Sequence, residues 1–229
     1  MDCHAVLHES GRMHITHLGH ACVLIEIDGT GVLIDPGSLS AATQARGVDA
    51  MLFTHSHVDH LDTDAVAELL QSNSPTDIVA DTASALILRD AGVEEVNTVD
   101  AHSTARLDVA GIGLSATTVQ HATIHCDLPS PVNNAYLVAD EVLHPGDAFW
   151  QPDRPVGVLM LPIGGPWMKL SESIDYLRTV SPKVAIPIHQ GGLAPAHRAL
   201  HCDLLTKLAP AGTRLLRLVD GERTDIAMS

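Results

Sequence analysis

The sequence predicts an α/β protein in which two mixed β-sheets pack face to face and helices cover both outer faces. Short apolar runs alternate with turn residues along the chain, which is typical of strands joined by tight connections. A group of such runs leads into a helical pattern twice, and two halves packed sheet against sheet account for that order. The length of 229 residues fits one domain, residues 1–229, with room for a large buried core.

The first half of the chain contains a hairpin, a buried strand and a helix in succession. Residues 21–27 and 32–34 are apolar runs on either side of the turn sequence DGTG, which predicts a hairpin. Residues 50–54 form another apolar run that leads directly into a histidine-rich loop. Apolar residues then recur at helical spacing, and either Asp62 or Thr63 is a suitable N-cap residue for that helix.

The remaining elements are predicted from apolar periodicity bounded by turn residues. Further strands are expected at residues 78–80, 106–110, 112–119, 135–138, 156–162, 184–188, 214–219 and 223–227. Further helices are expected at residues 82–90, 171–180 and 196–208. The run at 156–162 is almost continuously apolar, as in a strand covered on both faces, and it ends in an irregular loop rich in Gly and Pro.

Composition and charge restrict the partners that the protein can bind. The chain has 13 basic and 28 acidic side chains and a formal net charge of −15, which argues against nucleic acids and anionic membrane surfaces. No run approaches the roughly 18 apolar residues that span a bilayer. The first four residues, MDCH, lack the basic start of a signal peptide, and the four cysteines form no CxxC pair. We therefore expect a cytoplasmic protein with a small-molecule substrate, and homo-oligomer formation is left open.

Histidine is unusually abundant, with 15 residues against two each of Trp, Tyr and Phe. The segment at residues 54–60, THSHVDH, comes directly at the end of a predicted buried strand. On a helix, His55 and His57 would point to different sides, whereas on a loop leaving a strand they can converge on one ligand. Three imidazoles and a carboxylate so close together suit a divalent transition metal.

This segment resembles the signature of the metallo-β-lactamase superfamily, whose members are αββα sandwiches with one or two metal ions at the sheet edges. Members carry further ligands in a fixed order, and this chain offers a residue at each place. These are His121 or His125 after the middle strands, Asp147 after a following strand and His189 at the end of a late strand. The resemblance covers residues 14–190 and implies the same αββα sandwich that the order of elements predicts.

Shorter motifs resemble one branch of that superfamily, the small single-domain hydrolases related to ascorbate-phosphate lactonase. They are HLGHA at residues 17–21, LIDP at 33–36, LPIGG at 161–165 and PIH at 187–189. This branch resemblance implies a hydrolase and names no substrate.

The superfamily resemblance implies a role for each candidate ligand. The first metal would be held by His55, His57 and His121, the second by Asp59, His60 and His189, and both by Asp147. A shared carboxylate offsets the repulsion between two cations, and water bound there can ionise near neutral pH and act as the nucleophile. Asp59 would also orient that nucleophile and is therefore a catalytic candidate, as is His20, which could contact substrate or donate a proton. Zinc is the expected ion, one or two per chain, and a site without cysteine also suits manganese or iron.

Several positions admit two interpretations. Asp35 is expected to be a buried hydrogen-bond acceptor that holds the histidine loop. His20 is equally consistent with a core histidine bonded to the backbone. Cys126 is a candidate soft ligand, although a small buried thiol is the expected interpretation. Trp150 and Trp167 are either pocket walls or core residues.

The choice between His121 and His125 depends on where the preceding strand ends. His121 is preferred because it is the first residue free to turn into a site at the strand end, as His55 and His189 do. In an extended segment His125 would lie roughly 13 Å away and could not bind the same metal. It is expected to contact substrate or to support the site. His144 is expected to be structural, and the remaining histidines are expected on the surface or in the core: His4, His8, His14, His102, His197 and His201.

The function favoured by the sequence is metal-dependent hydrolysis of an ester, lactone, amide or phosphodiester bond in a small molecule. The alternative is a non-haem di-iron oxidoreductase on the same scaffold, although relatives of that kind usually have more carboxylates in the histidine loop, where this chain has His57. The other alternative is a catalytically inactive metal- or ligand-binding protein, which the presence of a candidate at every ligand position disfavours.

Overall fold

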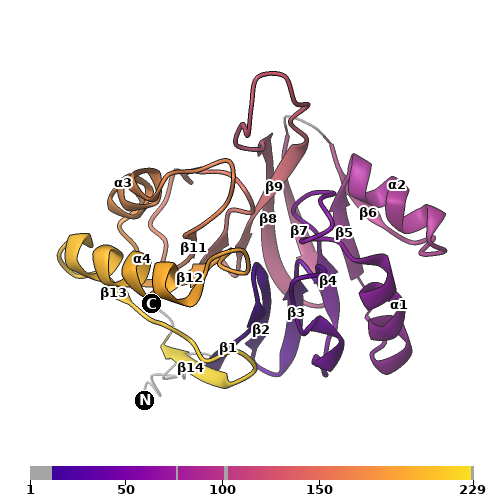
Figure 1. Cartoon of the computed structure of the whole chain (residues 1–229). Helices are drawn as coiled ribbons and strands as arrows, with labels where there is room; N and C mark the ends of the chain where they lie inside the picture. Colours follow the sequence, from indigo (N-terminus) through magenta and orange to yellow (C-terminus); the bar gives the residue numbers. More distant parts are fainter. Residues whose placement is uncertain (1–11, 76, 101–102, 228–229) are drawn as a thin grey trace, which may run out of the picture.

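Two mixed seven-stranded β-sheets pack face to face with helices on both outer sides, which confirms the predicted architecture (Figure 1). The computed structural model describes residues 12–75, 77–100 and 103–227. The helices are α1 (Thr63–Ser72), α2 (Thr82–Asp90), α3 (Leu170–Val180) and α4 (Pro195–Leu208), with a short 3-10 helix at Ala42–Gln44. In Figure 1, α1 and α2 lie at one side of the molecule and α3 and α4 at the other.

The two sheets have the same internal organisation. The first has the order β14 (Arg223–Ala227), β1 (Arg12–Gly19), β2 (Cys22–Ile27), β3 (Thr30–Ile34), β4 (Ala50–Leu52), β5 (Asp77–Asp81) and β6 (Asn97–Val99). The second has the order β13 (Arg214–Leu215), β12 (Val184–Ile188), β11 (Val158–Pro162), β10 (Val142–His144), β9 (Val132–Val138), β8 (Ile112–Gln120) and β7 (Thr104–Val109). Each sheet has four antiparallel strands followed by three that continue in parallel, and this is the architectural repeat that the sequence predicts.

This topology brings the carboxyl ends of several strands to one edge. In the first sheet β1 and β3 are both antiparallel to β2, and β4 is parallel to β3, so β1, β3 and β4 end on the same side. In the second sheet β8 and β10 are both antiparallel to β9, and β11 and β12 continue parallel to β10. The loops that leave these ends are therefore available to build one site, which is where open α/β architectures place their ligands.

The buried apolar side chains form three layers that fix the sheets and helices. The central layer lies between the sheets, and Tyr136 of β9 bridges them because its hydroxyl donates to the Phe53 carbonyl at 2.7 Å. One outer layer packs Leu69 of α1 and Leu88 of α2 under the first sheet, and the other packs Leu205 of α4 under the second. Each such leucine is fully buried and contributes about 1.5–3 kcal/mol relative to exposure.

The predicted N-cap of α1 is confirmed, since the Asp62 carboxylate accepts from the backbone N–H groups of Asp64 and Ala65. Three strands were not predicted: β1, β6 and β10. In β1 the inward Met13 and Ile15 alternate with polar residues, so the strand contains no continuous apolar run and is defined by its pairing with β2 and β14. The strand predicted at 214–219 is confined to β13, Arg214–Leu215.

No helix among the described residues is long and apolar enough to cross a membrane. Cys22, Cys126 and Cys202 are free thiols. Three of the histidines expected on the surface or in the core, together with Cys3, lie outside the described residues: His4, His8 and His102.

Candidate metal centre

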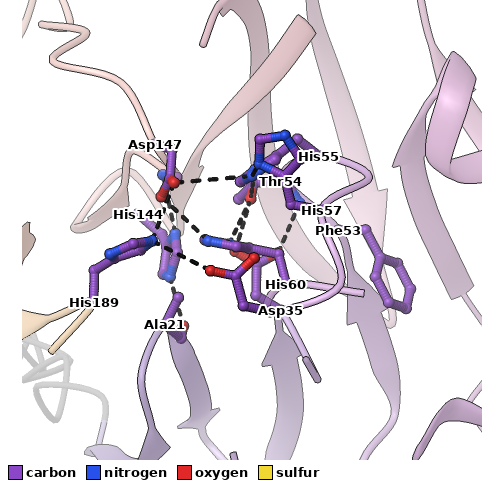
Figure 2. A network of polar contacts seen from close by, with 12 residues as sticks. Ala21, Asp35, Phe53, Thr54, His55, His57, His60, His144, Asp147 and His189 are labelled. Carbon is purple, nitrogen blue, oxygen red and sulfur yellow. Dashed lines mark hydrogen bonds and ion pairs between the residues drawn. The ribbon is translucent and has the colours of Figure 1, made fainter. Parts of the chain in front are cut away.

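The histidines and carboxylates predicted as ligands gather where the two sheets meet at this edge. Each leaves the carboxyl end of a strand, either directly or on the loop that follows it: the 55–60 loop after β4, His121 after β8, Asp147 after β10 and His189 after β12. His20 and Asp35 follow β1 and β3 in the same way. Figure 2 shows His55, His60 and His189 arranged around the carboxylate of Asp147.

The carboxylate of Asp147 is the centre of the cluster. His60 Nε2 lies 3.2 Å from its Oδ1, and His121 Nε2 and His189 Nε2 lie 3.3 and 3.0 Å from its Oδ2. His55 Nε2 is 3.9 Å from Oδ2 and 3.0 Å from His57 Nδ1. Donor atoms from both sheets thus surround one carboxylate.

Around Asp147 the side chains divide into two groups, and within each group the candidate donor atoms lie within 4.8 Å of one another. One group is His55, His57, His121 and Asp147. The other is His20, Asp59, His60 and His189. Apart from His20, this division places together the same residues that the sequence assigns to a first and a second metal. The assignment of individual ligands stays a prediction.

A divalent cation fits this set of atoms. Four of the candidate donors are buried and have no hydrogen-bond partner within the described residues: His60 Nε2, His121 Nε2, His189 Nε2 and Asp147 Oδ1. The three nitrogens are close to the Asp147 oxygens but do not have hydrogen-bond geometry toward them. Unsatisfied buried polar atoms are rare and costly, so their convergence at one place is best explained by an ion that they coordinate.

Asp35 orients two of the candidate ligands, His60 directly and His55 through Thr54, by hydrogen bonds. Its Oδ2 accepts from His60 Nδ1 and from the Thr54 hydroxyl, both at 2.7 Å, and its Oδ1 accepts from the Thr54 N–H at 2.7 Å. Because the Thr54 hydroxyl donates to Asp35, its oxygen is free to accept from His55 Nδ1 at 3.0 Å. Asp35 is fully buried, as expected for an acceptor that fixes the histidine loop.

Backbone carbonyls orient the other two histidines in the same manner. His121 Nδ1 donates to the Ala122 carbonyl and His189 Nδ1 donates to the Gly164 carbonyl. A proton on Nδ1 leaves the Nε2 lone pair free, which is how proteins prepare imidazoles for metal binding. His60 and His55 are held in this tautomer by Asp35 and Thr54.

His20 is oriented as a donor to Asp59 rather than as a ligand. Its Nδ1 accepts from the Gly191 N–H at 3.1 Å, so in the neutral ring the proton is on Nε2, which lies 3.0 Å from Asp59 Oδ2. Burial lowers the pKa of His20 and outweighs its hydrogen bond to Asp59, which favours the neutral ring. Burial alone would raise the pKa of Asp59, but the hydrogen bond from His20 and the nearby His60 lower it, so Asp59 is ionised.

The electrostatics of the centre depend on the two buried carboxylates. Burial alone would lower the pKa of His60, but Asp147 and Asp35 on either side raise it well above its usual value. Burial lowers the pKa of His55 well below its usual value, helped by the neighbouring His60. The pKa of Asp147 is far below its usual range despite burial, because His60 and His189 favour its charged form. A divalent cation here would meet carboxylates whose charged form is favoured, and coordination by His60 Nε2 would require that nitrogen to be deprotonated.

The backbone at this edge is strained at three of the site residues. His20, Asp35 and His189 have φ values of 52°, 52° and 60°, in the left-handed region that non-glycine residues rarely adopt. Gly37 lets the loop after Asp35 touch the histidine loop, because a Cβ there would lie 1.9 Å from the Asp59 carbonyl oxygen. Such strain is maintained where the surrounding structure requires one particular geometry.

The structure separates the two candidates of the 121–125 segment. His121 is buried in the cluster, whereas the His125 side chain is 60% exposed and faces Asp127. The expectation that Cys126 is buried is wrong: it lies on the exposed stretch of the loop that follows His121, where few apolar neighbours cover it.

Trp167 packs edge-on against His121 and His189, with ring centroids 6.0 and 5.6 Å away, so it forms a wall of the centre. Trp150 instead belongs to the outer layer near α3, where its carbonyl accepts from the Tyr176 hydroxyl. His144 is buried and bonds the Ala21 carbonyl at 2.9 Å, which is a structural contact. His14, His197 and His201 lie outside the two ligand groups.

We expect His121→Ala to lose about one equivalent of bound metal and His125→Ala to keep the wild-type content, because only His121 presents a buried nitrogen to the cluster. Elemental analysis of both variants, purified and reconstituted in parallel, measures this difference. Metal retained in the His121 variant and lost from the His125 variant would reverse the assignment.

Sequence reasoning missed residues that position ligands without binding metal. The Asn133 side chain accepts from the Asp147 N–H at 2.9 Å and donates to the Pro145 carbonyl at 2.8 Å, so it fixes the loop that carries Asp147. Gly146 allows this contact, since a Cβ there would lie 2.2 Å from Asn133 Oδ1. The signal available was a pair of amides, Asn133 and Asn134, inside an otherwise apolar strand.

Comparison with known proteins gives a consistent result over most of the chain. A family model described as the beta-lactamase superfamily domain matches residues 14–189. Protein Rv0786c of Mycobacterium tuberculosis is 38% identical over 210 residues, covering 89% of this chain and 96% of that protein. A protein of Methanopyrus kandleri named UPF0173 metal-dependent hydrolase is 34% identical over 203 residues, covering 80% of this chain and 86% of that protein.

Two solved structures show the same fold. Igni18, a metallo hydrolase from Ignicoccus hospitalis, has a TM-score of 0.71 at 22% identity, covering 95% of this chain and 100% of that chain. CmlA, a diiron β-hydroxylase from Streptomyces venezuelae, has a TM-score of 0.67 at 18% identity, covering 96% of this chain and 54% of that chain. At these identities the likeness concerns the fold alone, and the names of the two proteins show that it occurs both in a metallo hydrolase and in a diiron β-hydroxylase.

Proposed function

The chain belongs to the beta-lactamase superfamily, and we propose that it is a metal-dependent hydrolase that cleaves an ester, lactone, amide or phosphodiester bond in a small molecule. The observation that carries this proposal is the convergence of four imidazole nitrogens on Asp147, three of them buried without a hydrogen-bond partner. The name of the Methanopyrus kandleri relative agrees with it.

We assign the ligands as two sets that share one carboxylate. His55, His57 and His121 form one set, and Asp59, His60 and His189 form the other. Asp147 lies in the first group and within 3.2 and 3.0 Å of His60 Nε2 and His189 Nε2, so we assign it to both. All are nitrogen or oxygen donors, so zinc is the proposed ion, with manganese and iron as the alternatives. When bound, such cations supply Lewis acidity and bring the pKa of bound water toward neutrality.

The residues of the chain have distinct tasks in this scheme. Asp35, through Thr54, and the Ala122 and Gly164 carbonyls keep the histidines in the tautomer that presents Nε2. His20 donates to Asp59 Oδ2, which orients that carboxylate beside His189. Trp167 packs against His121 and His189 and forms a wall of the centre.

A di-iron oxidoreductase is the second function considered, because CmlA has the same fold. The two ligand groups here contain only two carboxylates, Asp59 and Asp147, and position 57 is a histidine. This nitrogen-rich set favours the hydrolase, since iron oxygenases of this scaffold are expected to be richer in carboxylate.

The protein is expected to bind one or two equivalents of a divalent transition metal and to unfold at a higher temperature when it is bound, because an ion that binds only the folded state stabilises it. The stabilisation should weaken below about pH 6, where protons compete for the imidazoles. Elemental analysis and thermal unfolding of chelator-treated and reconstituted protein measure both effects. Absence of bound metal after reconstitution with zinc, manganese or iron would refute the proposed function.

A further inference from the structure

A cavity of about 290 Å³ opens beside the second ligand set, where His20, Asp59 and His189 form one wall. The other walls are the side chains of Leu39, Pro166 and Leu193 and the backbone of three glycines. Gly164 permits close packing, because a Cβ there would lie 2.8 Å from the Leu193 side chain. The cavity adjoins the residues that orient the proposed reaction centre, so a substrate would have to occupy it.

None of the described residues that line this cavity is a lysine or arginine. Arg198 of the nearby α4 lines a different cavity and is paired with Asp220 at 3.5 Å. Among the described residues that line the cavity, the one acidic side chain is Asp59, and the chain as a whole has a net charge of −15. A phosphate or carboxylate at the far end of a substrate, away from the wall formed by the ligands, would therefore lose its hydration without gaining a lysine or arginine partner, which is costly.

One residue of the cavity lining, Leu39, is an exposed apolar side chain. Leu39 is 50% exposed, and its side chain reaches Gly191, whose N–H holds His20. Val58, between two candidate ligands, is 66% exposed, and its carbonyl accepts from the N–H of Ser38, the residue before Leu39. Of the nine large apolar side chains that the described residues expose, four lie on loops that carry or adjoin the ligands: Leu39, Val58, Ile124 and Leu128. The apolar side chains in the lining itself are Leu39, Pro166 and Leu193, and an apolar lining of a concave site indicates an apolar ligand.

We propose that this cavity selects an uncharged carboxylic acid derivative with an apolar acyl chain, and that it excludes substrates with a phosphate or carboxylate at the far end. The proposal rests on the hydrolase function and narrows its substrate class. In the reaction the oxygen of one water joins the carbonyl carbon and the bond from that carbon to the leaving alcohol or amine breaks. The leaving group departs with one proton of the water, and the acid releases the other.

Two matched esters test the preference for an uncharged chain on the metal-reconstituted protein. 4-Nitrophenyl hexanoate and the mono-4-nitrophenyl ester of adipic acid have the same reacting bond and the same six-carbon acyl chain, and they differ by one terminal carboxylate. We expect kcat/KM to be at least about tenfold higher for the hexanoate. Equal values, or a higher value for the adipate, would overturn the proposal.

Two leucine substitutions test whether the preference for the hexanoate ester arises at this cavity. Leu39→Lys places a cation at the cavity and should reduce the preference for the hexanoate severalfold, whereas Leu86→Lys, at a 57% exposed position on α2, should leave it unchanged. If the ratio of kcat/KM for the two esters were unchanged in the Leu39 variant, the cavity would not be the part of the protein that distinguishes the two acyl chains.

Two further measurements distinguish failure of this proposal from failure of the proposed function. Hydrolysis of bis(4-nitrophenyl) phosphate with no hydrolysis of either ester overturns the substrate class and leaves the hydrolase function intact. Hydrolysis of none of the three overturns the function. In that case the affinity of the cavity is measured by titration calorimetry, and hexanamide should bind more tightly than the monoamide of adipic acid. Tighter binding of the charged amide would overturn the proposal.

Discussion

Asp147→Asn is expected to reduce bound metal to at most one equivalent and to lower kcat/KM by on the order of 10³-fold or more. Asparagine has nearly the same shape, so the packing around β10 is preserved. It lacks the negative charge that faces His60, His121 and His189, and its amide presents N–H donors where a ligand oxygen is needed. The measurements are elemental analysis and steady-state kinetics on the best substrate found.

Asp127→Asn is the matched control for this variant. Its side chain is 85% exposed on the loop after His121 and contacts His125 and Cys126 away from Asp147, so the metal content of the centre and turnover should not change. If Asp147→Asn kept two equivalents of metal, Asp147 would not be the shared ligand, and the proposed two-ion arrangement would be wrong.

The fold could be predicted from sequence because its strands and helices have clear patterns and its halves repeat. The parallel strands β4, β11 and β12 are buried on both faces and therefore appear in the sequence as short, nearly continuous apolar runs. The short β6 and β10 and the alternating β1 contain too little continuous apolar sequence to be recognised, and they are strands because neighbouring strands pair with them. Three-residue strands depend on tertiary context more than on their own composition.

The candidate ligands could be predicted because they follow strand ends directly in the sequence. The groups that orient them could not, because those contacts join segments far apart in the chain. Thr54 contacts Asp35 across 19 residues, and Gly191 contacts His20 across 171 residues. The left-handed backbone at His20, Asp35 and His189 has no sequence signal, since histidine and aspartate adopt it only where the surroundings require it.

The position of Leu39 illustrates the same difference for the cavity. In sequence it is one apolar residue in a short loop, and such residues are common on protein surfaces. Its approach to Gly191 arises only when the loop after β3 packs on the histidine loop, where Ser38 N–H donates to the Val58 carbonyl and Gly37 lies against Asp59. The substrate preference therefore depends on contacts that form only when the loops at this edge of the sheets pack together, and the sequence of one loop does not predict it.

Asp35→Asn is expected to lower the free energy of unfolding by about 2–4 kcal/mol and to weaken metal binding as well, because a fully buried acceptor of three hydrogen bonds loses its charge. The amide can accept from one neighbour, but its N–H groups would face the donors of Thr54 or His60. Denaturant unfolding of the metal-free protein isolates the structural effect from the loss of metal. Asp62→Asn is the control, since asparagine is an equally good N-cap residue for α1 and should change stability by a few tenths of a kcal/mol at most.

The effect of Asp35→Asn should also depend on pH in a defined direction. The pKa of His60 in the folded protein is raised above the unfolded value of 6.5 because Asp147 and Asp35 flank it. A raised folded pKa contributes stability that is fully present below the unfolded value and is lost as the pH rises through the folded value. In the metal-free protein, the difference in free energy of unfolding between wild type and Asp35→Asn should therefore be largest near pH 6 and should decrease as the pH rises. Neutral His60 can still donate its Nδ1 proton to an amide oxygen, so less is lost at high pH. A difference in free energy of unfolding that increases with pH would show that Asp35 does not act through charged His60.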